Sequence, residues 1–227
     1  AGEGSHSCII ITKKGEQIFF RLGTLNVNSL KVVRKRRNIL RQLRSHCDAT
    51  CFQESKLDGA SANDVCKDDS GSWAFNNRNT KSGGVAIHLQ EKLGRYTDDD
   101  EFNNDDGSVV GRSVEFNGYK LYLVSVYAPC CGKSKSRLDA NMNILNEVEK
   151  LVISMKSKGH EVIVSGDLNF IRDDFLDADG GSPEIYKEQL EWVDRMAKYC
   201  GMFDAMRFLR PNERLYSCLL YTPSPRD

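Results

Sequence analysis

One stretch, residues 161–169, constrains the fold more than any other part of the chain. Its β-branched run Val-Ile-Val at residues 162–164 predicts a short strand that is buried on both faces. Gly166 ends this strand and allows a sharp turn and the close approach of a ligand, and Asp167 and Asn169 follow. Because open α/β sheets bind ligands at the carboxyl ends of their strands, this is a candidate site. Taken alone, an ordinary strand exit with a solvated aspartate is the simpler interpretation.

Three other apolar segments also end on polar side chains. Residues 19–25 lead to Asn26, residues 49–52 lead through a glutamine to Glu54, and residues 121–126 lead to Tyr127. Together with the aspartate they suit a magnesium-dependent phosphoryl site, since Mg²⁺ takes one or two carboxylates with water and substrate phosphate. Amide and phenol donors can hold the phosphate oxygens on which negative charge develops.

Five short motifs follow one another in a characteristic order and spacing. They are Thr-Leu-Asn-Val-Asn-Ser-Leu at 24–30, Phe-Gln-Glu-Ser-Lys at 52–56, Ser-Gly-Gly-Val-Ala at 82–86, Val-Tyr-Ala-Pro at 126–129 and Gly-Asp-Leu-Asn at 166–169. In this order they resemble the endonuclease/exonuclease/phosphatase family over nearly the whole chain. Within it, the chain is most similar to apurinic-type endonuclease domains of LINE retrotransposons and to exonuclease III-like enzymes.

The resemblance implies a fold and an activity. The fold is α/β (α+β), a four-layer sandwich of two packed mixed β-sheets flanked by helices, as in deoxyribonuclease I. The activity is that of a Mg²⁺-dependent phosphodiesterase, with Mn²⁺ able to substitute, that nicks DNA. Glu54 and Asn26 would serve the metal, Asp167 and Asn169 the attacking water, and Tyr127 the phosphate oxygens.

The C-terminal part departs from the family pattern. A Ser-Arg-Ile-Asp-like motif and a terminal Ser-Asp-His are absent, and the four histidines lie at positions 6, 46, 88 and 160. We therefore expect residues 18–217 to be the domain, incomplete at its C-terminus, with a lead-in or edge strand at 1–17 and a non-native tail at 218–227. Without the catalytic histidine, activity should be impaired. Cys130 also stands where many apurinic-type members have Asn, which puts a preference for abasic sites in question.

Other functions remain open. Another phosphoesterase of the same fold is one, although inositol phosphatases usually have Trp before Gly-Asp, where this chain has Ser165. Sphingomyelinase-like and deadenylase-like activities are further alternatives. The alternative outside enzymology is a catalytically dead fragment that only binds nucleic acid.

A predicted helix over residues 31–44 carries a basic face. Arg34, Lys35 and Arg37 lie on it, and Lys56 follows the Gln-Glu motif. These four side chains are the candidate DNA contacts, but a merely solvated basic face is the competing interpretation.

Bulk properties restrict the setting. The 32 Lys and Arg residues balance the 32 Asp and Glu residues, so net charge neither favours nor excludes nucleic acid. Apolar runs are too short to span a membrane, and the eight cysteines suit reduced thiols. We expect an intracellular monomer without a signal peptide. The resemblance to LINE endonuclease domains implies the nucleus as its setting and a reverse transcriptase domain in the parent polypeptide.

Periodicity predicts the remaining elements. Neighbouring strands are expected at 72–76 and 83–89, a hairpin at 109–127 around Asn117-Gly118, and a long helix at 138–158. A second helix should begin at residues 182–184 and bury Tyr186, Leu190, Val193, Ala197 and Cys200. Residues 58–69, with four aspartates, suggest a polar loop.

Overall fold

The computed structural model describes residues 6–13, 16–97, 99–131, 134–173, 175–177 and 187–214, with side chains from residue 19 onward. The elements follow in the order β1 (His6–Lys13), β2 (Glu16–Asn26), α1 (Val33–Arg44), β3 (Ala49–Gln53), α2 (Gly59–Asp68), β4 (Ser72–Asn76), β5 (Val85–Leu89), the 3₁₀ turn η1 (Glu91–Leu93), β6 (Phe102–Asn103), β7 (Val109–Phe116), β8 (Tyr119–Tyr127), α3 (Lys135–Ser157), β9 (Glu161–Asp167), α4 (Lys187–Cys200) and α5 (Ala205–Leu209).

The strands form two mixed sheets. The first has the order β1-β2-β3-β5-β4, and the second has the order β6-β7-β8-β9. Each contains one parallel pair, β2 with β3 and β8 with β9, while the other neighbours are antiparallel. Parallel pairs place their carboxyl ends at the same edge of a sheet, so each sheet delivers two strand ends to one place.

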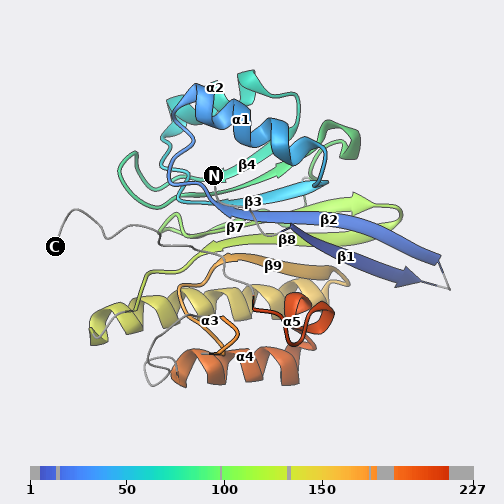
Figure 1. Ribbon diagram of the computed structural model, residues 1–227, viewed down its shortest axis with the longest axis vertical. Helices are drawn as coiled ribbons and strands as arrows, with labels where there is room; N and C mark the ends of the chain where they lie inside the picture. The colour runs from blue at the N-terminus through green and yellow to red at the C-terminus, as the bar shows by residue number, and fades with distance from the viewer. Residues whose placement is uncertain are drawn as a thin grey trace.

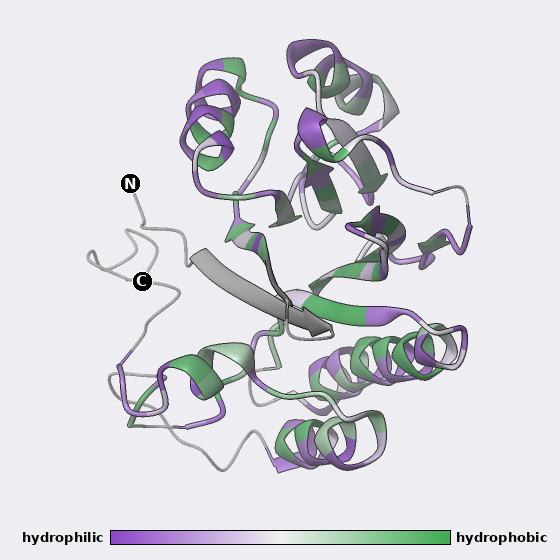
Figure 2. Cartoon of the chain, turned by 90° about the vertical axis from the view of Figure 1, so that its right-hand side faces the viewer, coloured by the Kyte–Doolittle hydropathy of each residue, from purple (hydrophilic) through white to green (hydrophobic). Residues whose placement is uncertain are grey.

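The two sheets pack face to face between two layers of helices (Figure 1). Apolar side chains of both sheets, including Phe20, Ile87 and Leu123, form the central core between them. Leu40 of α1 and Val65 of α2 pack on the outer face of the first sheet, and α3 and α4 cover the outer face of the second. Figure 2 shows the alternation of hydrophobic and hydrophilic residues along α3 and α4 that this one-sided burial requires. The predicted four-layer sandwich is confirmed.

Several predicted elements agree closely with the structure. The hairpin β7–β8 turns at Asn117 and Gly118, both with positive φ, as an Asn-Gly turn requires. Strands β4 and β5 pair with each other, and α3 corresponds to the long helix expected at 138–158, with Leu145, Val148 and Met155 among its buried residues. The expected helix start at 182–184, Tyr186 and the tail at 218–227 lie outside the described residues.

The polar loop expected at 58–69 is wrong, because most of it is helix α2. Asp58 caps the helix by accepting a hydrogen bond from the Ser61 backbone N–H at 2.9 Å. Only Ala62 and Val65 of this helix are buried, so its apolar stripe is two residues long. So short a stripe leaves almost no periodic signal in the sequence.

The expectation that residues 162–164 are buried on both faces is also wrong. They are half-buried, because β9 is the last strand in the order of the second sheet and pairs with β8 alone among the described residues. Their alternation still holds: Val162 and Val164 pack toward α3 and α4, and Ile163 packs toward the other sheet.

The buried face of α4 is turned by about one residue from the predicted one. Gln189, Trp192, Met196 and Cys200 are its buried side chains, whereas Ala197 is exposed. The prediction followed the aliphatic residues, but the larger apolar area of Trp192 and Met196 decides the orientation.

Two further observations concern the setting of the chain. The structure has free thiols at Cys47, Cys51, Cys66, Cys130, Cys131 and Cys200, in line with the prediction of reduced cysteines at these positions. Within the described ranges, no helix has both the length and the apolar character that crossing a membrane requires.

Candidate active site

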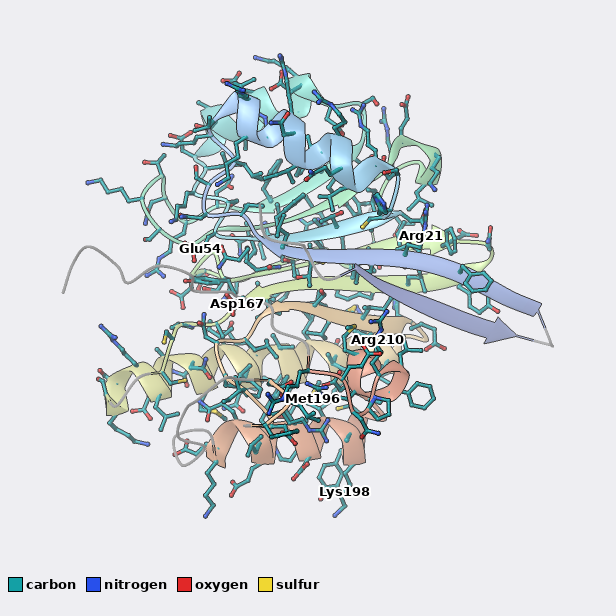
Figure 3. The ribbon with its side chains drawn as sticks, viewed as in Figure 1. Arg21, Glu54, Asp167, Met196, Lys198 and Arg210 are labelled. Carbon is teal, nitrogen blue, oxygen red and sulfur yellow. The ribbon has the colours of Figure 1, made fainter. Side chains whose placement is uncertain are left out.

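Four strand ends converge at one edge of the sandwich. In the first sheet Asn26 of β2 stands opposite Gln53 of β3, with Glu54 next. In the second sheet Tyr127 of β8 stands opposite Asp167 of β9. Figure 3 labels Glu54 and Asp167, which lie side by side at this edge. The structure therefore brings together the polar strand ends that the sequence singled out.

Asn26 connects the two carboxylates of this edge. Its Nδ2 donates to Glu54 Oε1 at 2.9 Å and to Asp167 Oδ2 at 3.1 Å. Its Oδ1 accepts from the Asn28 backbone N–H at 3.2 Å, which fixes the direction in which the amide faces. The first sheet thus holds the acid of the second through one side chain.

Glu54 is an ionised carboxylate among donors. The Lys56 ammonium lies 2.8 Å from Glu54 Oε2. Burial alone would raise the pKa of Glu54, but the hydrogen bonds from Lys56, Asn26 and Tyr127 and the Lys56 charge outweigh burial and lower that pKa. The group therefore carries its negative charge at neutral pH and is available to a cation.

The loop that carries Glu54 has an unusual backbone that a glycine motif supports. Glu54 and Lys56 both have positive φ, at 53° and 51°. The intervening Ser55 N–H donates to the Gly84 carbonyl at 3.0 Å, and Lys56 N–H donates to the Gly83 carbonyl at 3.0 Å. Gly84 has a φ of 82°, and a Cβ there would lie 2.5 Å from Ser55 Oγ, so a residue with a side chain would be strained here. The Ser-Gly-Gly motif therefore holds the carboxylate in place.

Tyr127 presents a protonated phenol to the same edge. Burial raises its pKa to about 12, and the nearby carboxylates of Glu54 and Asp167 add to this shift. Its backbone N–H donates to the Ser108 carbonyl at 2.8 Å, so the turn before β7 also supports it. A phenol that stays protonated is a hydrogen-bond donor for an anion over the whole physiological pH range.

Asp167 and Asn169 form a compact turn after β9. Asn169 has a positive φ of 54°, and its N–H donates to Asp167 Oδ1 at 3.1 Å. Its side-chain Nδ2 donates to the Ala128 carbonyl at 2.7 Å, and Ala128 N–H donates to the Asp167 carbonyl at 2.9 Å. Part of the role of Asn169 is therefore to lock its turn against the loop after Tyr127.

The four predicted basic contacts separate into two kinds. Lys35 and Lys56 lie at the site: Lys35 Nζ donates to the carbonyls of Val27 and Asn28, and Lys56 pairs with Glu54. Arg34 and Arg37 lie on α1 instead. Arg34 is exposed, and the Arg37 guanidinium lies 2.9 Å from the carboxylate of Asp68.

The histidines with described side chains are engaged elsewhere. His88 Nε2 lies 2.7 Å from Asp69 Oδ2, His160 Nε2 lies 3.0 Å from Ser113 Oγ, and His46 Nδ1 lies 2.8 Å from the Gln42 carbonyl. These contacts give each of them a structural role.

The donor set fits a hard divalent cation. No group of three or more His, Cys, Asp or Glu side chains gathers within the described part of the chain. Mg²⁺ does not need one, because it commonly binds to one or two carboxylates and keeps several waters. Glu54, with its lowered pKa, and the adjacent Asp167 meet that requirement.

A comparison with protein-family models now identifies the family. Residues 23–184, which include all five motifs, match the model of the endonuclease/exonuclease/phosphatase family. The chain belongs to this family. A hydrolytic nuclease or phosphatase activity follows at this level of detail, and the resemblance inferred from the motifs is confirmed.

Solved structures of the family share the fold. The AP endonuclease LMAP from Leishmania major has a TM-score of 0.69 and 16% identity, with 86% of this chain and 70% of that chain covered. The 3'-5' exonuclease NExo from Neisseria meningitidis has a TM-score of 0.67 and 20% identity, with 88% and 78% covered. An AP endonuclease from Archaeoglobus fulgidus has a TM-score of 0.64 and 18% identity, with 91% and 80% covered. A search of curated proteins finds no match.

Sequence reasoning missed two side chains behind the site, Asn141 and Gln189. Both are fully buried and lie on the apolar stripes of α3 and α4, against the loops that follow Tyr127 and Asp167. A polar residue at a core position of an amphipathic helix is a usable signal, because most buried polar groups find partners, as the Asn141 amide and Gln189 Nε2 do here.

Proposed function

We propose that this family member is a Mg²⁺-dependent phosphodiesterase that nicks DNA, with Mn²⁺ able to replace Mg²⁺. The observation that carries the proposal is the bridge from Asn26 to both Glu54 and Asp167. It holds a candidate metal ligand and a candidate water-activating acid within reach of one phosphate group. The resemblance to LINE retrotransposon endonucleases supports DNA as the substrate, a reverse transcriptase domain in the parent polypeptide, and action in the nucleus as a monomer.

Glu54 is the residue that would bind the metal ion, and Asn26 would hold its carboxylate in place. A bound Mg²⁺ would polarise the scissile phosphate and neutralise charge that develops there. The ion pair with Lys56 supports this assignment, since Glu54 already balances a positive charge at this position.

Asp167 is the residue that would orient or deprotonate the attacking water. Its Oδ2 is held by Asn26 and its Oδ1 by the Asn169 N–H, so the carboxylate is oriented before substrate arrives. It would accept a proton from the water or align it against the phosphorus, with Asn169 beside it. Tyr127, whose high pKa keeps its proton, would donate to the phosphate oxygens as negative charge builds up.

The missing histidine limits the expected rate. The family's Asp-His pair has no counterpart in this sequence, and a positioned general acid or base contributes about 10²–10⁴-fold. We infer that the chain as given turns over slowly. Positioning by Asn26 and electrostatic stabilisation by Tyr127 would leave a measurable residual activity.

DNA contact falls to the basic side chains near the site. Arg34 and Arg37 of α1 face outward, Lys56 pairs with Glu54, and Lys35 donates to the carbonyls of the two residues after Asn26. Lysine and arginine at such positions neutralise phosphates without reading base sequence.

Nicking of supercoiled plasmid in Mg²⁺ tests the proposal. The wild-type chain should convert supercoiled to open-circular DNA, Glu54→Ala and Asp167→Ala should reduce the rate to background, and a chelator should abolish it. Equal background nicking by all three proteins overturns the endonuclease assignment. Retained DNA binding would then support a catalytically dead binding fragment.

One observation favours a phosphomonoesterase as the second candidate. The 3' phosphatase NExo from Neisseria, solved with a product DNA hairpin, shares the fold with a TM-score of 0.64 and 18% identity. A DNA hairpin that ends in a 3'-phosphate, incubated with the chain and Mg²⁺, would release inorganic phosphate if this activity is the true one. Release without plasmid nicking would favour the phosphatase.

A further inference from the structure

Asn141 of α3 ties together the two loops that carry the second sheet's site residues. Its side chain is fully buried, and its Nδ2 donates to the Pro129 carbonyl at 2.8 Å and to the Leu168 carbonyl at 3.1 Å. Pro129 comes two residues after Tyr127, and Leu168 comes one residue after Asp167. One amide group therefore contacts both loops just beyond the site.

The position of this contact matters because the strand ladder ends there. The pairing of β8 with β9 stops at Tyr127 and Asp167, and one further backbone bond runs from Ala128 N–H to the Asp167 carbonyl. Beyond it no backbone bond joins the described residues of the two loops, and the side chains of Asn169 and Asn141 bridge them instead. The ladder fixes the backbones of Tyr127 and Asp167, so these contacts fix the loops that follow and, with them, Asn169.

Gln189 of α4 fixes Asn141 in turn. Its Nε2 donates to Asn141 Oδ1 at 3.3 Å and lies 3.0 Å from Cys131 Sγ, in the same loop as Pro129. Gln189 is also fully buried. Because it satisfies the acceptor of Asn141, the two N–H donors of that amide are directed at the loop carbonyls.

We propose that Asn141 and Gln189 are positioning residues, which hold together the loops after Tyr127 and Asp167 and so fix Asn169 and the directions of the Tyr127 and Asp167 side chains for phosphodiester hydrolysis. The inference rests on the proposed function for its catalytic part, but its structural part stands on these contacts. Neither residue touches substrate in this assignment. They act through the loops, and outer contacts of this kind change activity by about 10–100-fold when removed.

Amide hydrogen exchange tests the structural part without any activity. The variants are Asn141→Ala and Gln189→Leu, with Asn143→Ala as the matched control, since Asn143 is exposed on the same helix. Exchange at residues 127, 128, 130 and 131 and at residues 166–170 should rise at least tenfold in both variants, while exchange in β2 and β3 stays at the wild-type level. Unchanged exchange in the two loops overturns the inference, and so does a uniform increase across the chain.

Nicking kinetics test the catalytic part. Asn141→Ala should lower kcat at least tenfold and leave the Kd for DNA within twofold of wild type. In a Tyr127→Phe background, Asn141→Ala should lower kcat by a smaller factor, because the phenol hydroxyl that Asn141 helps to position is already absent. An equal fall in kcat in both backgrounds overturns the positioning role.

The two assays also separate the two proposals. If the wild-type chain neither nicks DNA nor releases phosphate, the proposed function is overturned, and amide exchange in the two loops still tests whether Asn141 and Gln189 hold them. If the wild-type chain is active and the Asn141→Ala variant is equally active, only the positioning role of Asn141 and Gln189 is overturned. If Asn141→Ala does not fold, Gln189→Leu carries both tests, because it removes the bonds to Asn141 Oδ1 and Cys131 Sγ but leaves the loop carbonyls with their donor on Asn141.

Discussion

Asn26 Nδ2 and Asp167 Oδ2 are 3.1 Å apart, although 141 residues separate them in the chain and they belong to different sheets. The bond exists because β2 and β9 both end at the same edge of the sandwich. The geometry of the site therefore depends on the relative position of the two sheets. A change in the packing of the central core should shift Asp167 relative to Asn26.

Replacing Asn26 with alanine tests this relationship. Asn26→Ala removes the donor from Glu54 and Asp167, which leaves two neighbouring carboxylates without the group that separates them. We expect the nicking rate in Mg²⁺ to fall about 10–100-fold, as for other groups that orient a metal ligand. The folded fraction from circular dichroism should stay at the wild-type level, and Asn143→Ala should nick at the wild-type rate. An unaltered rate in Asn26→Ala would contradict the bridge.

The phenol of Tyr127 should keep its function in alkaline solution. With a pKa raised to about 12, it remains a donor where an ordinary tyrosine, with a pKa near 10, loses its proton. The wild-type nicking rate should therefore show no decline from this group between pH 8 and about 10.5. Tyr127→Phe should lower the rate about 10²-fold, the usual cost of losing one donor to a developing oxyanion.

The control for this prediction is the shape of the two pH profiles. Wild type and Tyr127→Phe should run parallel over the range, since the phenol does not titrate within it. A fall in the wild-type rate with a midpoint near 10 that is missing from Tyr127→Phe would show that Tyr127 ionises at its ordinary pKa.

The strand ends of the site were predictable from the sequence, but its supporting groups were not. Asn26, Glu54, Tyr127 and Asp167 each follow an apolar run, and this local signal places them at strand ends. The parallel pairing then gathers them at one edge. Local patterns of this kind survive in a single sequence because they depend on short stretches alone.

The features of the fold and the site that could not be predicted depend on contacts between distant segments of the chain. Which face of α4 is buried follows from Trp192, whose indole N–H donates to the Leu145 carbonyl at 2.9 Å on α3. The role of Asn141 follows from loops that lie 12 and 27 residues away in the chain. The half-exposure of β9 follows from its place at the end of the sheet order. Periodicity within one segment contains none of this information.

Asp69 and His88 form a buried pair that should make stability depend on pH. Asp69 Oδ2 lies 2.7 Å from His88 Nε2, and Asp69 also pairs with Arg44 and accepts from the Gly71 N–H at 2.9 Å. Burial by itself would raise the pKa of Asp69, but the hydrogen bonds from His88 and Arg44 outweigh it and hold that pKa well below its usual range. The ionised form is therefore stabilised by folding.

The sign of the effect follows from this lowered pKa. Its contribution is complete above the unfolded pKa, near 3.8, and disappears as the pH falls through the lower folded value. Asp69→Asn should lower the free energy of unfolding by about 3 kcal/mol at pH 7, as for a buried pair that loses one partner. The deficit should be unchanged at pH 5 and should shrink below pH 4 in urea unfolding curves. Asp64→Asn is the control, since the exposed pair of Asp64 with Lys67 should contribute less than about 0.5 kcal/mol.

Gly166 is a described glycine at which an added methyl group should be strongly destabilising. A Cβ at this position would lie 2.0 Å from the Val126 carbonyl oxygen, which belongs to the backbone of the adjacent β8 and cannot rotate away. In Gly166→Ala, β9 must move away from β8 at the point where Asp167 leaves the sheet. We expect a loss of at least about 1–3 kcal/mol in the free energy of unfolding, the usual cost of forcing extra volume into a packed region. Nicking per folded molecule should also fall, because Asp167 moves with the strand.

Gly59→Ala is the matched control, since nothing lies within 4 Å of its added Cβ and its backbone is helical. It should leave both quantities unchanged or raise stability slightly. Equal stability and equal nicking in the two variants would show that β9 tolerates the shift, and that the position of Asp167 does not depend on this close approach of the strands.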